Sequence, residues 1–416
     1  MSSVVPEGWS QIKIGDIGSF FGGLTGKTAK DFGEGHPFLT YMQVYLQQTS
    51  DVEAMNSVRI DEGEKQNAVA YGDILFTTSS ETSDEIGMTD VFLQNNQTPY
   101  LNSFCFGLRP ITPSPIDPTF GKYVFRGDDF REDMRPLAQG STRFNLSKGN
   151  LAKLSLLVPP LPEQKKIASI LTSVDEVIEN TSRQIDKLQD LKKATMNELL
   201  TKGIGHTEFK DSELGRIPKS WDVVQLKDNL EFISYGFTNP MPETSTGVPM
   251  ITAKDVTEGS INYKTARNTS REAFDSLLSA KSRPLIGDIL LTKDGSLGRL
   301  AIVDREDICI NQSVAVLRPN EEVSSSFLFH LLEAPLYQKI MMENAGGSTI
   351  KHIYITVVDK MKVVRPPCSE QDKIVAVLSS INKRVDRVIE KLSQTQSLKK
   401  SLMQDLLTGK VRVTVN

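Results

Sequence analysis

The sequence predicts an α+β protein in which two similar globular lobes are separated by two long helices that form an intramolecular antiparallel coiled coil. The first observation is a duplication: a block that begins at Pro159-Pro160 recurs 207 positions later, beginning at Pro366-Pro367. A period of this length exceeds solenoid repeats, so the repeating unit is a whole domain with its connector. The second observation is a heptad pattern of apolar residues within each copy of the block.

Outside this block, fewer residues are identical between the two halves, and the matching positions are offset by 207 to 215 residues. Gly72-Asp73-Ile74-Leu75 returns as Gly287-Asp288-Ile289-Leu290, and Leu108-Arg109-Pro110 returns as Leu317-Arg318-Pro319. Because the offset drifts, we expect one shared scaffold with different loops. The predicted segments are a first lobe over 1–158, a central helical spacer over 159–216, a second lobe over 217–365 and a C-terminal helical spacer over 366–416.

Within the lobes, short apolar runs alternate with clusters of Gly, Pro, Ser, Thr and Asn. This alternation indicates short strands joined by many loops. Residues 104–108 and 314–317 are predicted strands, and residues 325–342 are predicted to be helical despite Pro335.

Each spacer is predicted to form one long helix, which ends at Gly203 in the first copy and at Gly409 in the second. The first helix can begin at Pro162, and Ser369 with Asp372 makes a serine-x-x-acid cap for the second. Apolar residues recur in each helix at alternating spacings of three and four. The predicted seam consists of Leu171, Val174, Ile178, Ile185, Leu188, Ile374, Leu378, Ile381, Val385, Val388, Leu392, Leu398 and Leu402, with Thr181 and Thr395.

A one-sided seam has to be covered, either by the other copy in the same chain or by another chain. The intramolecular pair is favoured because the two copies are held at high effective concentration. The lobe between them gives the chain room to return, so an antiparallel arrangement is expected. A general dimerisation coiled coil is the alternative.

The composition is that of a soluble globular protein, with 38% hydrophobic and 24% charged residues. No apolar run approaches the roughly 18 residues that span a bilayer, and we expect a cytoplasmic protein. Cys105, Cys309 and Cys368 are isolated from one another and from the histidines, which argues against a metal site or a disulfide framework. The net charge is -4, and only residues 367–416, with 9 basic and 5 acidic side chains, are basic. Binding of a polyanion would need locally concentrated charge or a partner.

Loops of both lobes combine basic, amide and hydroxyl side chains, which are the groups that contact base edges and phosphates in DNA. No catalytic triad can be assembled from spacing, and Gly26-Lys27-Thr28 lacks the first glycine of a phosphate loop because position 21 is Phe21. The sequence therefore favours a binding protein over an enzyme. The DNA-binding candidates are Lys27, Thr28, Lys30, Thr78, Ser79, Ser80, Arg143, Asn145, Thr238, Asn239, Lys254, Lys293, Ser296, Arg299, Thr349, Lys351 and His352.

The repeated motifs resemble those of a known family. Each lobe is opened by Pro-x-x-Trp, ending at Trp9 or Trp221, and is closed by Pro-Pro-x-x-Glu-Gln leading into a long helix that ends in Leu-Leu-Thr. This arrangement resembles the specificity subunit of type I restriction-modification enzymes over essentially the whole chain. The stretch 161–167 is the most specific part, and the second copy departs from it because Cys368-Ser369 replaces Leu161-Pro162.

The resemblance implies two target-recognition domains, each reading one half of a split DNA sequence, with the helices as a spacer between them. It also implies two modification subunits, which bind S-adenosylmethionine and methylate adenine. Restriction subunits that use ATP and magnesium to translocate and cut DNA are implied as well. This chain would carry neither activity and would need no cofactor or metal of its own.

Two other functions remain open at this point. A DNA methyltransferase would need a glycine-rich cofactor loop after a strand, and the sequence shows none. A coiled-coil adaptor would use the same duplicated lobes to bind protein instead of DNA.

Overall fold

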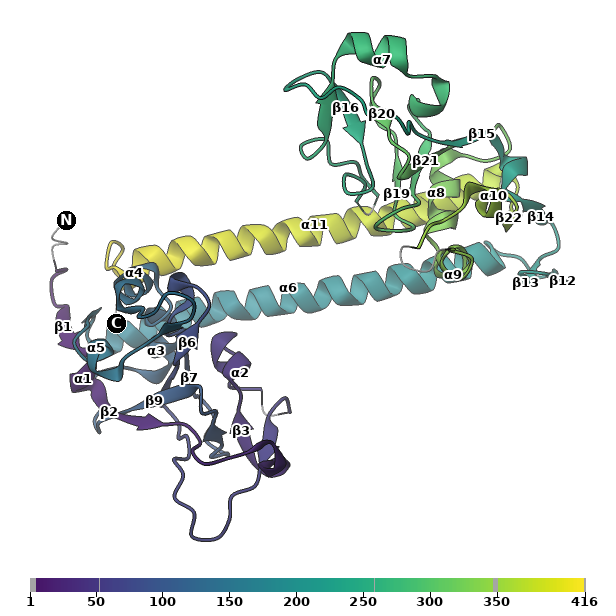
Figure 1. Cartoon of the computed structure of the whole chain (residues 1–416). Coiled ribbons are helices and arrows are strands. Elements are labelled where there is room, and N and C mark those ends of the chain that lie inside the picture. The colour runs from purple at the N-terminus through teal and green to yellow at the C-terminus, as the bar shows by residue number, and fades with distance from the viewer. Residues whose placement is uncertain (1–4, 52, 258, 347–350, 415–416) are drawn as a thin grey trace. The chain divides into compact units, whose positions relative to one another are not determined.

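The structure is a computed structural model that describes residues 5–51, 53–257, 259–346 and 351–414. The chain divides into two compact units: unit 1 comprises residues 1–182 and 391–416, and unit 2 comprises residues 183–390. The long helices α6 (Leu161–Lys202) and α11 (Cys368–Leu407) each contribute to both units (Figure 1). Lobe 1 denotes residues 1–158 of unit 1, and lobe 2 denotes residues 217–365 of unit 2.

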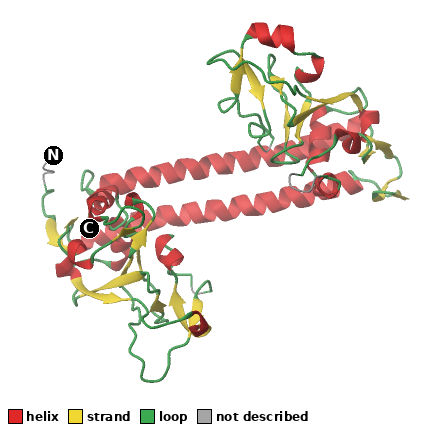
Figure 2. Ribbon diagram, in the orientation of Figure 1, coloured by secondary structure: helices red, strands yellow, loops and turns green. Residues whose placement is uncertain are grey.

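Lobe 1 is made of short strands and short helices (Figure 2). Its strands are β1 Ser10–Lys13, β2 Gly18–Gly22, β3 Phe32–Leu39, β4 Asn56–Val58, β5 Ile74–Thr77, β6 Ser79–Ser80, β7 Thr89–Val91, β8 Tyr100–Leu101, β9 Cys105–Pro110, β10 Phe144–Asn145 and β11 Ser155–Val158. Its helices are α1 Ile14–Ile17, α2 Tyr41–Tyr45, α3 Pro118–Val124, α4 Asp128–Met134 and α5 Lys148–Leu151. The two larger sheets have the strand orders β2-β9-β5-β7 and β4-β3-β8. The first strand, β1, pairs with the last, β11, which leads directly into α6.

Unit 2 repeats this architecture. After the hairpin of β12 Phe209–Ser212 and β13 Gly215–Pro218, its strands are β14 Asp222–Gln225, β15 Leu230–Tyr235, β16 Val248–Ile251, β17 Arg267–Thr269, β18 Ile289–Thr292, β19 Leu300–Ile302, β20 Cys309–Ile310, β21 Val314–Pro319 and β22 Lys362–Arg365. Its short helices are α7 Arg271–Leu277, α8 Ser325–Glu333, α9 Pro335–Glu343 and α10 Ile355–Val358. The sheet orders β15-β21-β18-β19 and β17-β16-β20 match those of lobe 1, and β14 pairs with β22 as β1 pairs with β11. The duplication in the sequence is therefore a duplication of fold.

The predicted local elements are largely confirmed. Strand β9 covers the first predicted run except Phe104, and β21 covers the second. The predicted helix over 325–342 is two helices, since Pro335 starts α9. Gly203 and Gly409 follow the two long helices with φ of 67° and 72°, a conformation in which glycine is favoured. The predicted cap at Ser369 is wrong. The carbonyl of Pro367 already accepts the backbone N–H of Gln371 at 3.1 Å, so α11 begins at Cys368.

In each unit the portions of the two long helices run antiparallel (Figure 1). In unit 1, Asp175 of α6 pairs with Lys399 of α11 at 2.6 Å, and Glu163, closer to the start of α6, pairs with Arg412 beyond the end of α11. In unit 2, Glu370 near the start of α11 accepts a hydrogen bond from the backbone N–H of Ile204, just after the end of α6. In each unit, a contact therefore connects the start of one helix with the end of the other.

The predicted seam residues are buried or half-buried, with one exception. Leu171 and Leu378 have no exposed surface and belong to the hydrophobic cores of units 1 and 2. Leu398 is 53% exposed, so its assignment to the seam is wrong. The three-four spacing places Lys399 at that position, where its ammonium group pairs with Asp175. The other buried or half-buried members are Val174, Thr181, Ile178, Ile185, Leu188, Ile374, Ile381, Val385, Val388, Leu392, Thr395 and Leu402.

The repeated glutamate of the Pro-Pro-x-x-Glu-Gln motif holds the helix junction in both units. In unit 2 the buried carboxylate of Glu370 accepts hydrogen bonds from Trp221 Nε1 at 2.9 Å, from the backbone N–H of Ile204 at 2.9 Å and from His206 Nε2 at 2.8 Å. In unit 1 the equivalent Glu163 forms two hydrogen bonds with the guanidinium of Arg412, at 2.8 and 2.9 Å. The motif is therefore kept in both copies for a structural reason.

Other repeated residues also connect elements within each lobe. Asp73 and Arg109 form a bidentate ion pair between the start of β5 and the end of β9, and Asp288 and Arg318 form the same pair in lobe 2. The aspartates are almost fully buried, and a bidentate arginine is the geometry that a buried carboxylate needs. The repeated Gly-Asp and Leu-Arg-Pro motifs thus stabilise the scaffold and are not candidates for DNA contact.

Candidate nucleic-acid interface

In lobe 1, a short antiparallel ribbon brings together candidates that lie more than sixty residues apart in the sequence. Strand β6 pairs with β10, so that Ser79 lies opposite Asn145. The backbone N–H of Leu146 donates to the carbonyl oxygen of Thr78 at 2.8 Å and extends the pairing. This ribbon, with the loop that precedes β10, is called the lobe 1 hairpin site.

The lobe 1 hairpin site presents a cation next to an exposed aromatic ring. Arg143 Nε donates to Ser79 Oγ at 3.2 Å, and its guanidinium carbon lies 5.5 Å from the centre of the Phe104 ring. Phe104 is 53% exposed, and Arg143 and Asn145 are also exposed. Guanidinium and amide groups can form paired hydrogen bonds to guanine and adenine edges, respectively.

A hollow of about 640 Å³ adjoins this ribbon. The Tyr41 hydroxyl donates to the carbonyl oxygen of Ser79, and the Tyr45 hydroxyl donates to Glu85, both at 2.7 Å. Burial raises the pKa of Tyr41, and the bond to Glu85 raises the pKa of Tyr45, so both hydroxyls keep their protons at neutral pH. The hollow is lined by Tyr41, Met42, Tyr45, Ser79, Ser80, Glu81, Glu85, Thr142 and Arg143.

Lobe 2 contains the same ribbon with other side chains. The backbone of Asp294 bridges that of His352, and the backbone N–H of Ile353 donates to the carbonyl oxygen of Lys293 at 2.9 Å. With the duplication offsets of 215 and 207, Asp294 corresponds to Ser79 and His352 corresponds to Asn145. This arrangement is called the lobe 2 hairpin site.

The side chains of the lobe 2 hairpin site form a connected polar cluster. Asp294 Oδ1 lies 2.5 Å from His352 Nδ1, and Asp294 Oδ2 lies 2.8 Å from the ammonium nitrogen of Lys293. Burial opposes ionisation of Asp294, but the hydrogen bonds from Lys293 and His352 outweigh it and hold its pKa below the ordinary value. The ammonium groups of Lys293 and Lys281 lie 5.6 and 5.9 Å from the centre of the exposed Tyr235 ring.

The hairpin loop of lobe 1 is closed by two backbone hydrogen bonds between Gln139 and Asn145. In lobe 2, two backbone hydrogen bonds join Gly346 and His352 in the same way. In lobe 1 this loop holds the repeated Gly-Ser-Thr motif, and Gly140 has a φ of 127° with the carbonyl of Arg143 packed against its Cα. A Cβ at this position would meet that oxygen at 2.3 Å, so the loop needs glycine. The candidate Thr349 in lobe 2 lies outside the described residues.

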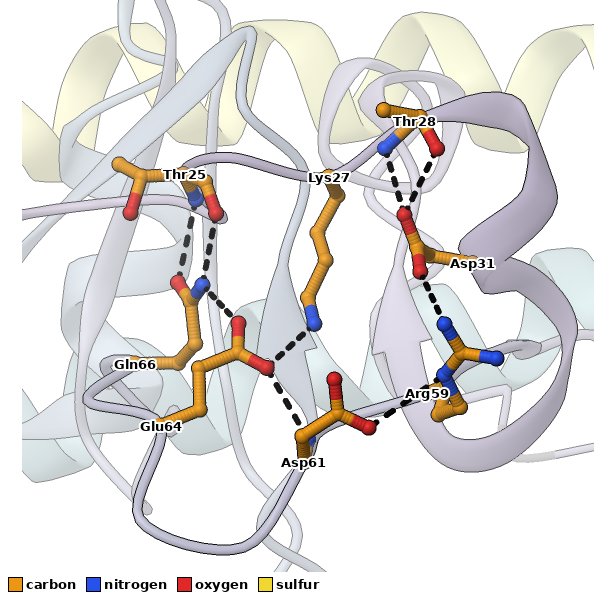
Figure 3. Close-up of polar contacts among 8 residues, drawn as sticks. All are labelled: Thr25, Lys27, Thr28, Asp31, Arg59, Asp61, Glu64 and Gln66. Atoms are coloured by element: carbon orange, nitrogen blue, oxygen red, sulfur yellow. Dashed lines mark hydrogen bonds and ion pairs between the residues drawn. The ribbon is translucent and has the colours of Figure 1, made fainter.

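The candidates Lys27, Thr28 and Lys30 lie in a separate region, between β2 and β3. Figure 3 shows the contacts of Lys27 and Thr28. The Lys27 ammonium group is mostly buried and pairs with Glu64 at 2.5 Å, and Thr28 donates its backbone N–H and its hydroxyl to Asp31, each at 2.8 Å. Lys27 thus joins two loops of lobe 1, and Thr28 is used within its own loop, whereas Lys30 is exposed. We therefore expect less DNA contact from Lys27 and Thr28 than from Arg143 and Asn145.

The Glu64 carboxylate gives this region a pH dependence. The hydrogen bond from Lys27 is the main reason that the pKa of Glu64 falls from 4.5 to about 2. Because its pKa is lower in the folded state, Glu64 stabilises the fold above about pH 4.5, and this contribution is lost as the pH falls towards 2. We expect Glu64→Gln to lower the urea midpoint of unfolding at about pH 7, with a deficit that shrinks in acid. The exposed neighbour Glu62, changed to Gln, is the control. A deficit of the Glu64→Gln variant that is unchanged at about pH 2 would contradict this account.

The remaining lobe 2 candidates are spread along its loops. Ser296 lies in the turn between β18 and β19, and Arg299 lies at the end of that turn, where its backbone N–H donates to Thr292 Oγ1 at 2.9 Å. Lys351 is exposed and precedes His352 directly. Thr238, Asn239 and Lys254 are exposed in segments after β15 and β16, so the structure does not place them in the lobe 2 hairpin site.

Several residues of the two hairpin sites were not among the sequence candidates. They are Tyr41, Met42, Tyr45 and Phe104 in lobe 1, and Tyr235, Lys281 and Asp294 in lobe 2. A pairing between residues 79 and 145 leaves no local pattern in the sequence. The duplication offers one signal, since aligning the halves sets Asp294 against the candidate Ser79.

No helix in the described part of the chain is long and apolar enough to cross a membrane. No group of three or more His, Cys, Asp or Glu side chains within the described ranges is arranged to hold a metal ion.

Comparison with known proteins places the chain in a family. The family model described as type I restriction modification DNA specificity domain matches residues 6–190 and, a second time, residues 218–396. The putative type I restriction enzyme MjaX specificity subunit of Methanocaldococcus jannaschii is 29% identical over 425 residues, which cover 98% of this chain and 95% of that protein. The MjaVIII specificity subunit of the same organism is 27% identical over 422 residues, covering 98% and 94%.

Solved structures show the same fold. A chain from a structural study of complex assembly and conformational transition of the type I R-M system has a TM-score of 0.63 at 15% identity, covering 98% of this chain and all of that one. The S subunit of a type I system from M. genitalium has a TM-score of 0.54 at 17% identity, covering 96% of each chain. Because the family model matches both lobes together with much of both long helices, the chain belongs to the family of type I restriction-modification DNA specificity proteins.

Proposed function

We propose that this chain reads a bipartite double-stranded DNA sequence for a type I restriction-modification complex, with one half-site read by each lobe. The main support is that the two hairpin sites share one backbone arrangement but differ in their side chains. Lobe 1 has Ser79 and Asn145 in this ribbon, with Arg143 beside them. In lobe 2, Asp294 takes the position of Ser79 and His352 takes the position of Asn145. A reader of two different half-sites needs this combination, whereas a reader of a palindrome would use identical lobes.

The chemistry of the exposed side chains fits base reading. Arginine can donate two hydrogen bonds to guanine O6 and N7, and asparagine can bridge adenine N6 and N7. Phe104 and Tyr235 add exposed apolar surface beside these polar groups. Hydroxyl groups of the lobe 1 loop, such as that of Thr142, suit contacts to phosphate oxygens, which position a protein on DNA without reading its sequence.

The chain itself would be non-catalytic and would act with partner subunits. Its net charge of -4 is low for a protein that holds DNA alone, because binding through phosphates depends on many Lys and Arg contacts. Modification subunits would supply further DNA contacts and the methyl transfer from S-adenosylmethionine. Restriction subunits would supply the ATP-dependent translocation and cleavage.

Deleting the gene tests this function. We expect methylome sequencing of the deletion strain to lack one bipartite adenine mark that the parent strain carries, and the mark to return when the intact gene is restored. If the parent strain expresses the chain and the deletion strain still has the same methylome, the proposal that the chain reads DNA is contradicted. This result would favour the alternative in which the lobes bind protein.

A further inference from the structure

We propose that His352 reads a base that presents an amino group in the half-site of lobe 2, with Asp294 as the residue that positions its imidazole ring. This inference rests on the proposed function. It goes further by naming the reading residue of lobe 2, its supporting residue and the class of base. Adenine and cytosine are the bases that present an amino group in the major groove.

The geometry of the cluster restricts the imidazole ring. Asp294 Oδ1 lies 2.5 Å from His352 Nδ1, and the backbones of the two residues are bridged to each other. The second carboxylate oxygen, Oδ2, is occupied by the ammonium group of Lys293 at 2.8 Å. Asp294 is therefore held from both sides, and only Oδ1 faces the histidine. The side chain of His352 is still 40% exposed, whereas that of Asp294 is 22% exposed.

This hydrogen bond fixes the tautomer of the neutral ring. An ionised carboxylate can only accept a hydrogen bond, so Nδ1 of His352, which contacts Asp294 Oδ1, must carry the proton that it donates. In the neutral imidazole the other nitrogen, Nε2, then has a free lone pair and acts as an acceptor. Among the described residues Nε2 has no hydrogen-bond partner, so an acceptor is left for a ligand.

An acceptor at this position selects between the bases of the contacted strand. Adenine offers its N6 amino group and cytosine its N4 amino group in the major groove, whereas guanine O6 and thymine O4 are acceptors that would leave Nε2 without a donor. One such contact is expected to favour an amino-bearing base by about tenfold. Lobe 1 carries Ser79 and Asn145 at the equivalent positions, so this mode of reading belongs to lobe 2 alone.

The test uses the full chain expressed in its host with its partner subunits, and methylome sequencing as the readout. We expect His352→Ala to relax one position of one half-site from adenine or cytosine to all four bases, while the other half-site stays fixed. His352→Gln should retain methylation where that base is adenine, because a glutamine amide can bridge N6 and N7. The matched control is Asn145→Ala, which should alter only the opposite half-site.

Asp294 is tested by two variants. Asp294→Ala should relax the same position as His352→Ala, because the ring is no longer held. Asp294→Asn should restore part of the selectivity, because the amide oxygen can still accept from Nδ1. A uniform loss of methylation at all sites with no change in sequence would give the pair a structural role and overturn the proposal. If the His352 variants leave both half-sites unchanged while lobe exchange still alters one, this inference fails and the proposed function stands.

Discussion

Replacing Glu370 by alanine is expected to lower the free energy of unfolding of unit 2 by about 2–4 kcal/mol. The carboxylate accepts hydrogen bonds from Trp221 Nε1, from the backbone N–H of Ile204 and from His206 Nε2. Trp221 has no exposed surface, so its N–H would be left buried without a partner. An unsatisfied buried donor retains its full desolvation cost, which is why the expected loss exceeds that of an ordinary hydrogen bond.

The chain offers a convenient measurement because each unit contains one tryptophan, Trp9 in unit 1 and Trp221 in unit 2. In a Trp9→Phe background, urea unfolding followed by fluorescence reports on unit 2. The matched control is Glu163→Ala, followed by Trp9 in a Trp221→Phe background. Its partner Arg412 is 42% exposed and can regain water, so we expect a smaller loss. Equal losses at the two positions would show that the three hydrogen bonds of Glu370 do not add the stability assigned to them.

Replacing Leu378 by alanine is expected to lower the free energy of unfolding by about 2–5 kcal/mol, whereas Leu398→Ala should stay within about 0.5 kcal/mol of the parent chain. Leu378 has no exposed surface and lies in the hydrophobic core of unit 2, whereas Leu398 is 53% exposed. Both residues lie in α11, so the comparison keeps helix and substitution constant. Urea unfolding of both variants checks the difference. A Leu398→Ala loss as large as that of Leu378→Ala would mean that Leu398 is buried in the folded chain.

The large features could be predicted from the sequence because they repeat. Two copies of a fold leave a long-range pattern that no local context hides, and a heptad pattern indicates a long helix with one apolar side. The position of Leu398 shows where this reasoning fails. The hydrophobic side chain of Leu398 suggests a seam position. Each residue advances an α-helix by about 100°, however, so the position that faces the seam after Thr395 is residue 399. Lys399 fills that place with its long side chain and pairs with Asp175.

The candidate site was predictable only in part. Arg143 and Asn145 were found because of their residue types, but their pairing with Ser79 depends on a ribbon that joins distant segments. Residue type also drew attention to Lys27, whose ammonium group is used internally by Glu64. Asp294 was missed because an acidic residue argues against DNA contact unless its partner is known. Its role depends on His352, which lies 58 positions away.

Exchanging residues 1–158 for the lobe of a relative with a different target tests the central claim most directly. Methylome sequencing of the strain that carries the hybrid chain is the measurement. If each lobe reads one half-site, one half of the methylated sequence should change to that of the donor, while the other half stays as in the parent. A hybrid that methylates DNA with both halves changed, or with neither changed, would contradict two independent readers.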